Sequence, residues 1–503
     1  MIEFSAAQVA TLCNGRLSTG TDPDIRIDVA KIVTDSRESV PGSLYVAKAG
    51  EHADGHDFIP AAFAGGAVLV LAERSLTTGR RVDHVQGPYP AVIVEDAILA
   101  MGALAAEVVR VIRSHSPLTV IGITGSAGKT TTKDLLAGIL GPLGPTVAPV
   151  GSYNGEVGVP LTVFGADEAT RYLIIEMGAT KIGHISYLSG LVKPDIGVVL
   201  CVGSAHAGEF GSIENIAEAK GELVQALPAN GTAILNFDDS RVRAMAARTA
   251  APITYFSSAD AQGTGTANTV QARNVRTTDG QPEFELTFPG ETLAHPVHSR
   301  LLGLHHVTNL LAAATAAYAA GADPAQIAAS LNTQGAVSRY RMERTERADG
   351  VTVINDAYNA NPESMRAALR TLAELGAGGT RRTWAVLGEM RELGETSILE
   401  HDAVGRVAVR LNISRLVVVG TPARAMHVGA VMEGSWGDES VFVLDTEAAF
   451  ELLERELAPG DVVLLKSSRD AGLRLLGDRI TLPSKGLPQN IHIDKPGERT
   501  QQP

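Results

Sequence analysis

The chain has 503 residues, of which 45% are hydrophobic and 20% are charged. This composition predicts a folded globular protein of about three domains rather than a disordered chain. The formal net charge of −13 argues against a nucleic-acid backbone as the main partner, although a local basic pocket would still hold an anion.

Cysteine usage and hydrophobic segments indicate the compartment. The only two cysteines are Cys13 and Cys201, which excludes a disulfide framework or a zinc finger and fits a reducing environment. The N-terminus lacks the basic and apolar regions of a signal peptide. The longest apolar stretches, such as residues 196–202, are too short to span a bilayer. We therefore expect a cytoplasmic monomer without membrane insertion.

Residues 1–112 are predicted to form a small mixed α/β domain. Short strands are expected at residues 43–47 and 67–72, because apolar and β-branched residues are bounded there by turn-forming ones. A polar, glycine-rich loop at residues 49–58 separates the two strands. A helix over residues 96–114 then leads out of this domain.

Residues 113–335 are predicted to form a central domain on a parallel sheet. Strands alternate there with helical segments, which is the pattern of parallel strands joined by crossover helices. The expected strands are residues 118–123, 172–176, 196–201 and 232–236. An alanine-rich helix at residues 309–320 follows, and its small side chains suit close packing.

Residues 336–482 repeat the α/β pattern and are predicted to form a third, Rossmann-like domain. The expected strands are residues 351–355, 382–387, 415–419, 441–444 and 461–466. Residues 483–503 lose hydrophobic periodicity and are rich in Pro, Lys, Gln and Gly. We expect this tail to be disordered. The predicted fold class is therefore α/β with three domains.

A glycine-rich segment after the strand at residues 118–123 carries the clearest functional signal. It consists of Gly125, Ser126, Ala127, Gly128, Lys129, Thr130 and Thr131. Backbone N–H groups of such a loop approach phosphate oxygens closely, and the dipole of the following helix favours anions. Lys129 can reach the β- and γ-phosphates of ATP, and the Thr130 hydroxyl can bind Mg²⁺. Ile123 stands where the standard motif has glycine, and a simple strand-to-helix turn is the alternative.

Polar residues follow the next two predicted strands. Glu176 ends one strand, and His206 comes shortly after the other. Ligands of open α/β sheets gather at the carboxyl ends of the strands. Both side chains are therefore candidate metal ligands, with a solvated carboxylate and a structural histidine as the alternatives. Lys220 lies on an amphipathic helical segment, and its spacing alone indicates a surface lysine.

Residues 301–309 present polar side chains before the alanine-rich helix. His305 and His306 are adjacent, so they point in different directions in most conformations, and a metal is no better supported than a hydrogen-bonding role, such as a contact to a nucleotide base.

The last third of the chain adds charged candidates. Asp356 ends another predicted strand, and Arg339 and Arg341 lie upstream of it. Arginine stabilises phosphoryl charge through its planar set of donors. Lys466 and Arg469 follow the last predicted strand, where a solvated basic pair is the alternative.

The motifs together resemble the Mur ligase family. The resemblance rests on residues 124–131, 176–178, 206, 219–222 and 309, which occur in the family's order. It extends over about residues 25–475. Within the family, residues 153–162, 355–362 and 387–394 are similar to the members that add D-alanyl-D-alanine. Residues 35–37, 41–42 and 54–56 are similar to the family's first domain, which binds the uridine-nucleotide sugar.

The resemblance implies a role for each matched residue. Lys129 and Thr130 would hold the phosphates of ATP and Mg²⁺, together with Gly125, Ser126, Ala127, Gly128 and Thr131. Metal ligands would be Thr130, Glu176, His206 and Lys220, the last as a carbamylated lysine. Asn309 would contact adenine, and Arg341 would reach the γ-phosphate with Asp356 beside the nucleotide. Implied catalytic residues are Lys129, Lys220, His206, Arg341 and Asp356, and implied substrate-binding residues are Ser36, Arg37, Asp54, His56, Asn359 and Asn361.

The implied activity is ATP-dependent formation of an amide bond through an acyl phosphate. UDP-N-acetylmuramoyl-tripeptide and D-alanyl-D-alanine would be the substrates, with Mg²⁺ as cofactor. One residue departs from the family pattern, because His306 replaces an asparagine and imidazole lacks the paired donor and acceptor of an amide. The alternatives are a phosphate-loop ATPase that acts as a switch and a non-catalytic homologue. Residues 35–37 and 54–56 argue against the first, and retention of Lys129, Glu176 and Lys220 argues against the second.

Overall fold

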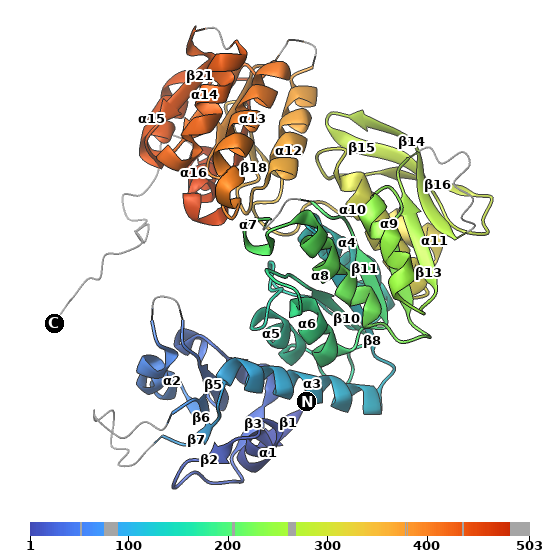
Figure 1. The fold of residues 1–503 in the computed structure, drawn as a ribbon, viewed down its shortest axis with the longest axis vertical. Helices are drawn as coiled ribbons and strands as arrows, with labels where there is room; N and C mark the ends of the chain where they lie inside the picture. Colours follow the sequence, from blue (N-terminus) through green and yellow to red (C-terminus); the bar gives the residue numbers. More distant parts are fainter. Residues whose placement is uncertain are drawn as a thin grey trace, which may run out of the picture. The chain divides into compact units, whose positions relative to one another are not determined.

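A computed structural model describes residues 1–50, 53–74, 89–203, 207–259, 268–377, 379, 381–434 and 437–482. The chain divides into two compact units. The first comprises Met1–Arg339 with Glu392–Glu395, and the second comprises Tyr340–Arg391 with Thr396–Pro503 (Figure 1). The predicted tail at residues 483–503 lies outside the described residues. Within the described part of the chain, no helix is long and apolar enough to cross a membrane.

The first unit begins with a five-stranded sheet of order β2-β7-β6-β5-β4. Its strands are β2 Arg16–Leu17, β4 Ile32–Val33, β5 Ser43–Ala47, β6 Ala67–Ala72 and β7 Ala91–Ile93, and β1 Glu3–Ser5 pairs with β3 Arg26–Asp28 beside it. The central strands β5 and β6 are mostly apolar and almost entirely buried, as expected for parallel strands covered on both faces. The helices here are α1 Ala6–Leu12, α2 Ile59–Ala64 and α3 Ala97–His115.

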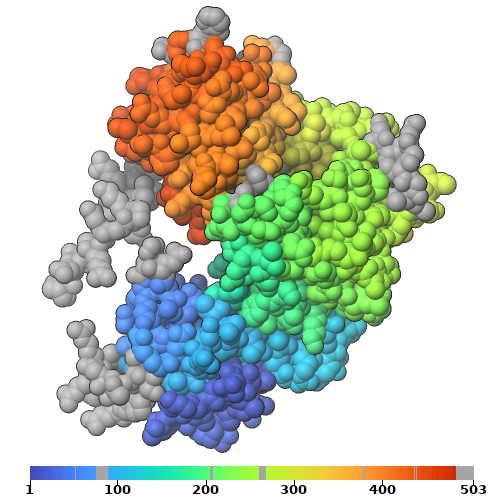
Figure 2. Space-filling model, viewed as in Figure 1, coloured from blue at the N-terminus to red at the C-terminus, as the bar shows by residue number. Residues whose placement is uncertain are grey.

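Helix α3 links this sheet to the rest of the first unit. Asp96 caps its N-terminus by accepting hydrogen bonds from the N–H groups of Ile98 and Leu99. The buried face of α3 packs against α5 (Gly158–Phe164) and α6 (His184–Val192) of the next sheet. One hydrophobic core runs through both parts, and their surfaces are continuous in Figure 2.

The second sheet of the first unit has nine strands in the order β16-β15-β14-β13-β12-β11-β8-β10-β9. The strands are β8 Thr119–Thr124, β9 Thr146–Val147, β10 Tyr172–Glu176, β11 Ile196–Val199, β12 Thr232–Asn236, β13 Ile253–Ser257, β14 Thr269–Thr278, β15 Gln281–Thr287 and β16 Ala294–His298. The helices are α4 Lys129–Leu140, α5 Gly158–Phe164, α6 His184–Val192, α7 Ala207–Phe210, α8 Ile213–Gln225, α9 Ser240–Ala244, α10 His306–Ala319 and α11 Pro324–Thr333.

Two cores cover the two faces of this sheet. Alternate residues of β8, such as Val120 and Ile121, belong to opposite cores, as the two-residue period of a strand requires. Helices α5, α6 and α8 pack on the first face, and α4, α10 and α11 pack on the second. Strands β8 to β14 are parallel to one another, so their carboxyl ends lie at one edge of the sheet.

The antiparallel extension β14–β16 was not predicted from the sequence. Strand β14 shifts register between Arg273 and Arg276, and its outer half is largely exposed, so neither an alternating nor a continuous apolar pattern is present. Strand β16 forms the edge of the sheet and carries Pro296. Asn332 of α11 accepts from His298 N and donates to Pro296 O, which covers part of this edge.

The second unit contains a six-stranded sheet of order β17-β18-β22-β19-β20-β21, with only β17 antiparallel. Its strands are β17 Glu343–Glu346, β18 Thr352–Asn355, β19 Thr383–Leu387, β20 Arg415–Val419, β21 Ser440–Val443 and β22 Val462–Lys466. Its helices are α12 Pro362–Leu375, α13 Ser397–Arg410, α14 Arg424–Glu433, α15 Thr446–Glu456 and α16 Leu473–Thr481.

The predicted α/β class is confirmed, and every predicted strand is present. The predicted bounds of β5, β6, β10, β12 and β20 are those observed. The other predicted strands differ at their ends by one or two residues, and β11 ends at Val199 rather than at residue 201. The predicted domain ranges 1–112, 113–335 and 336–482 remain predictions; the two compact units divide between Arg339 and Tyr340.

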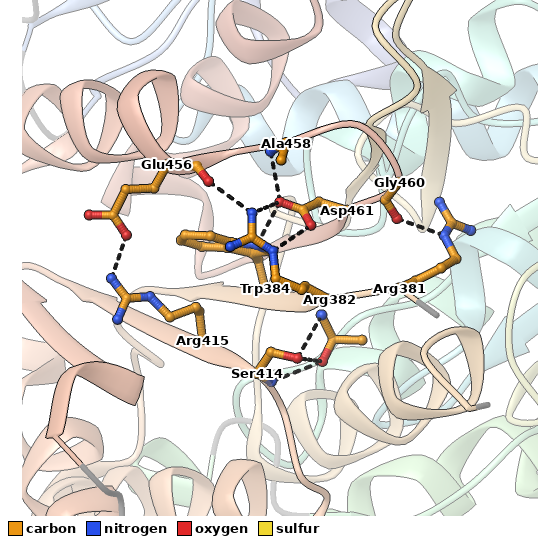
Figure 3. Close-up of polar contacts among 10 residues, drawn as sticks. Arg381, Arg382, Trp384, Ser414, Arg415, Glu456, Ala458, Gly460 and Asp461 are labelled. Atoms are coloured by element: carbon orange, nitrogen blue, oxygen red, sulfur yellow. Dashed lines mark hydrogen bonds and ion pairs between the residues drawn. The ribbon is translucent and has the colours of Figure 1, made fainter. Parts of the chain in front are cut away.

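A polar cluster at the amino ends of β19, β20 and β22 fastens the second unit (Figure 3). The buried carboxylate of Asp461 accepts hydrogen bonds from Arg382 Nε at 2.9 Å, Trp384 Nε1 at 3.1 Å and Ala458 N at 2.9 Å. Arg382 and Arg415 lie over the buried indole of Trp384, with their Cζ atoms 5.5 and 5.4 Å from the ring centroid. The Asp461 carboxylate is therefore the acceptor that allows the Trp384 indole N–H and the Ala458 N–H to be buried.

We expect Asp461→Ala to destabilise the second unit by about 1–3 kcal/mol, because it leaves the buried Trp384 N–H and Ala458 N–H without their acceptor. Urea unfolding followed by Trp384 fluorescence measures this locally. The chain has two tryptophans, so the measurement uses a Trp436→Phe background.

The matched control is Asp349→Ala. Asp349 also pairs with an arginine, Arg347, at 2.6 Å, but its side chain is 44% exposed, and such pairs contribute at most about 1 kcal/mol. Equal destabilisation by the two variants would contradict the role assigned to Asp461.

Candidate functional site

The glycine-rich loop lies between β8 and α4, as predicted. Gly128 has φ +84° and precedes the first residue of α4. A Cβ at this position would lie 2.1 Å from Asn309 Oδ1. Only glycine therefore fits both the left-handed backbone and the space. The N-terminus of α4, with its partial positive charge, faces the loop and favours an anion there.

The loop is fastened to the chain that follows β11. Ser126 N donates to Cys201 O at 3.0 Å, and Ser126 Oγ accepts from Gly203 N at 2.9 Å. The Lys129 ammonium donates to Gly125 O at 2.9 Å. Its charge is thus held over the loop.

Glu176 is a buried carboxylate beside this loop. It ends β10, is 1% exposed, and accepts from Thr130 Oγ1 at 2.9 Å and from Asn154 Nδ2 at 2.8 Å. Both donors are neutral, and a buried charge is costly unless a counter-charge accompanies it. Carboxylate and hydroxyl oxygens are the ligands that Mg²⁺ prefers, so Thr130 and Glu176 fit that ion. The sequence reasoning gave Asn154 no role of its own.

Lys220 lies on the inner face of α8 and is 3% exposed, so it is not the surface residue that its spacing indicated. Burial first, and then the nearby positive charge of Lys129, lower its pKa to about 7. Within the described residues, its ammonium makes no hydrogen bond or ion pair. At neutral pH, a buried amine of this pKa is neutral and nucleophilic in a much larger fraction of molecules than an exposed lysine is.

The Glu222 side chain attaches α8 to the N-terminus of α6. Its carboxylate accepts from Gly183 N at 2.6 Å and from Ser186 N at 2.8 Å, in the first turn of α6. A negative charge at a helix N-terminus is stabilising. This cap fixes the helix that carries Lys220, and sequence reasoning treated Glu222 only as part of a motif.

Asn309 and His306 lie together on the first turns of α10. Both are buried, and Asn309 Nδ2 lies 3.1 Å from His306 Nδ1. The imidazole accepts from the amide, which leaves Asn309 Oδ1 facing Gly128 of the loop. His305 stacks on His306 with ring centroids 4.1 Å apart. The histidine that departs from the family pattern therefore orients Asn309.

The predicted first-domain residues lie in two turns. Asp35 accepts from Arg37 Nη2 at 2.6 Å, which lowers the pKa of Asp35, and the Arg37 side chain is 88% exposed. Ser36 begins the same short turn.

His56 is buried rather than open to a ligand. Its Nδ1 lies 2.6 Å from Asp54 Oδ1, and its Nε2 accepts from Glu73 N at 3.1 Å. Backbone and side-chain hydrogen bonds from His56 hold the pKa of Asp54 well below its usual range. Both ring nitrogens have protein partners, so the geometry supports a role for His56 in orienting Asp54.

The predicted residues of the second unit lie around the ends of β18 and β22. Asp356 Oδ2 accepts from Lys466 Nζ at 2.6 Å, and Arg341 lies 4.4 Å from the ring centroid of Tyr358. Asn361 caps α12 in a capping box, and Asn359 is exposed. The side chain of Asn361 therefore has a structural role at the start of α12.

The first unit thus brings together Lys129, Thr130, Glu176, Lys220 and Asn309. His206 lies outside the described residues. Among the residues that are described, no group of three or more His, Cys, Asp or Glu side chains forms a metal site. The carboxylate, the hydroxyl and the neighbouring amine are the features suited to a nucleotide and its cation.

Three family models together match most of the chain. Residues 28–119 match the Mur ligase family, catalytic domain; residues 123–317 match the Mur ligase middle domain; and residues 340–469 match the Mur ligase, glutamate ligase domain. A UDP-N-acetylmuramoyl-tripeptide–D-alanyl-D-alanine ligase of Mycobacterium tuberculosis is 46% identical, over 95% of this chain and 98% of that protein. The enzyme of that name from Escherichia coli is 34% identical, over 94% and 97%.

Solved structures are similar over the same length. MurF from Acinetobacter baumannii superposes with a TM-score of 0.82 at 29% identity, covering 96% of this chain and 99% of that one. MurF ligase from Thermotoga maritima, in complex with ADP, superposes with a TM-score of 0.72 at 26% identity, covering 90% and 99%. These findings confirm the three-domain α/β architecture, and the chain belongs to the Mur ligase family of ATP-dependent ligases.

Proposed function

We propose that this ligase joins D-alanyl-D-alanine to UDP-N-acetylmuramoyl-tripeptide in the cytoplasm, during synthesis of peptidoglycan precursors. The names of the similar proteins support this pair of substrates. The observation that carries the catalytic part is the buried Glu176–Thr130 contact beside Lys129, since it provides a cation site and a phosphate cradle in one place.

ATP is proposed to bind with its phosphates on residues 125–131. The Lys129 ammonium offsets phosphate charge, and the backbone of the loop surrounds the oxygens. The Asn309 amide donates to His306, and its Oδ1 lies beside Gly128 of the loop. We propose that Asn309 contacts the nucleotide.

Mg²⁺ is proposed to be held by Thr130 and Glu176, with His206 as a further ligand. When bound, the ion neutralises phosphate charge and orients the γ-phosphoryl group. The fit is supported by the hard oxygen donors and by the absence of a cationic partner for the Glu176 carboxylate in the described residues.

Lys220 is proposed to react with CO₂ and become a carbamate. The neutral amine attacks the carbon of CO₂ and loses a proton, which converts a buried neutral amine into an anionic carbamate. Its pKa of about 7 supports this reaction, because the amine is already neutral in much of the protein at physiological pH. The product would be a second carboxylate-like oxygen donor near Lys129.

The proposed reaction has two steps, formation of an acyl phosphate and its attack by an amine. A carboxylate oxygen of the tripeptide attacks the γ-phosphorus, ADP leaves, and an acyl phosphate forms. The amine of D-alanyl-D-alanine then attacks the carbonyl carbon, loses a proton, and releases inorganic phosphate. Arg341 is proposed to stabilise the γ-phosphoryl charge and Asp356 to hold the segment beside it. Exclusion of water protects the acyl phosphate from hydrolysis.

Substrate residues are proposed in two places. Ser36, Arg37 and Asp54, with His56 behind Asp54, would bind the uridine-nucleotide sugar, and the exposed Arg37 guanidinium suits a diphosphate. Asn359, which is exposed, and Asn361 would lie near the peptide acceptor.

With UDP-N-acetylmuramoyl-tripeptide and ATP, we expect D-alanyl-D-alanine, but not meso-diaminopimelate, to stimulate ADP release and form the pentapeptide product. Lys129→Ala should lower kcat about 10²–10³-fold, because it removes a charge aimed at the transferring phosphoryl group. Coupled ADP assays and mass spectrometry of the product measure both effects.

Lys193→Asn is the control for charge removal. Lys193 is an exposed lysine of the same unit with φ +48°, a conformation that asparagine tolerates. It should retain full turnover. Activity with diaminopimelate alone, or full turnover of Lys129→Ala, would overturn the proposal.

Lys220 gives a separate test. At a fixed concentration of ¹³C-labelled CO₂, we expect a carbamate NMR signal that grows as pH rises from 6 to 8, because the neutral amine increases through its pKa of about 7. Lys220→Met should lose the signal and lower kcat by about 10–100-fold, as loss of a metal-supporting group does. A carbamate signal that persists in Lys220→Met, or full activity of that variant, would contradict the assignment.

A further inference from the structure

The second unit begins with a backbone turn formed by Tyr340, Arg341 and Met342, which we call the arch. Tyr340 has φ +61° and Met342 has φ +51°, with Arg341 between them. Residues other than glycine rarely adopt this left-handed region, and they persist there only when the surrounding structure holds them. Two such residues on either side of one arginine indicate that the position of Arg341 is imposed on the chain.

The side chain and the backbone of Tyr340 both form hydrogen bonds to other parts of the second unit. Its hydroxyl donates to Asp478 Oδ2 of α16 at 2.9 Å, and its N–H donates to Glu343 Oε2 at 3.0 Å. Its carbonyl oxygen accepts from Tyr358 N at 3.3 Å. The hydroxyl bond is the only one of these that spans more than a hundred residues of sequence, so it fixes the arch to a distant helix.

Met342 is held through a buried ion pair. Its N–H donates to Asp356 Oδ1 at 3.1 Å, and Asp356 Oδ2 accepts from Lys466 Nζ at 2.6 Å. Lys466 is 3% exposed and also donates to Asn359 O at 3.0 Å. The sequence allowed a solvated basic pair at this strand end, and Lys466 is instead a buried cross-link between β18 and β22.

Arg341 lies between these two attachments. Its guanidinium lies 4.4 Å from the centroid of the Tyr358 ring, a cation–π contact that orients the planar group. The arch and the Asp356–Lys466 ion pair therefore restrict the backbone of Arg341, and the Tyr358 ring restricts the orientation of its guanidinium.

We propose that Tyr340, Asp478 and Lys466 are positioning residues for Arg341, which they hold by keeping the arch in its left-handed conformation. The inference rests on the proposed role of Arg341 at the γ-phosphate. Loss of one attachment lets the backbone relax toward ordinary negative φ values and displaces the guanidinium. A displacement of about 1 Å at a catalytic group can cost as much as 10²-fold in rate.

Tyr340→Phe and Asp478→Asn are the main variants, because each removes or weakens one peripheral hydrogen bond without leaving a charge buried. We expect each to lower kcat about 10-fold, with KM for both peptide substrates unchanged within about twofold. Lys466→Met should have a larger effect but also leaves Asp356 uncompensated, so its folding is checked by circular dichroism.

The decisive comparison is made in an Arg341→Ala background. A residue that acts through Arg341 loses its effect there, so Tyr340→Phe should leave the already reduced kcat unchanged. Tyr318→Phe, which removes a hydroxyl from a tyrosine of α10 packed on Phe288, should retain full activity in the parent protein.

The outcomes separate the two proposals. Full activity of Arg341→Ala would overturn the proposed role of Arg341 itself. A slow Arg341→Ala with fully active Tyr340→Phe and Asp478→Asn would overturn the positioning role alone. A 10-fold loss from Tyr340→Phe that is the same with and without Arg341 would also overturn it, because the tyrosine would then act independently.

Discussion

The buried carboxylate of Glu176 is the constraint around which the nucleotide site is arranged. It lies at the carboxyl end of β10, pairs in register with Ile123 of β8, and accepts from Thr130 at the start of α4. The strand, the loop and the helix are thereby held by one anion that has only neutral donors within the described residues. Such a group favours a bound cation, and the cation in turn favours the phosphates that the loop is shaped to accept.

Positive charge near the loop complements this anion. Lys129 is fastened over the loop by Gly125 O, and its charge contributes to the low pKa of Lys220 on α8. Two lysines close together are unfavourable in the protein alone. The proposed binding of phosphates beside Lys129 and the proposed conversion of Lys220 into an anion would both remove this repulsion. The Glu222 cap on α6 attaches the helix that carries Lys220 to the neighbouring helix.

Sequence reasoning was most successful where one local pattern determined the result. Apolar runs predicted β5, β6 and β10 with their observed bounds, and the glycine-rich segment predicted the turn from β8 into α4. Other features depend on contacts between distant segments. The burial of Lys220, the cap formed by Glu222 and the Asn154 contact to Glu176 require the packing of several helices and loops. Strand β14 was missed because a register shift removes its periodicity.

The central claim is that this site activates a carboxylate by transferring the γ-phosphoryl group of ATP to it. The most direct measurement uses UDP-N-acetylmuramoyl-tripeptide labelled with ¹⁸O in its terminal carboxylate, together with ATP and D-alanyl-D-alanine. Because the attacking oxygen remains with phosphorus when the amide bond forms, the inorganic phosphate released should carry one ¹⁸O atom for each product molecule. Unlabelled phosphate accompanying amide formation would contradict the account.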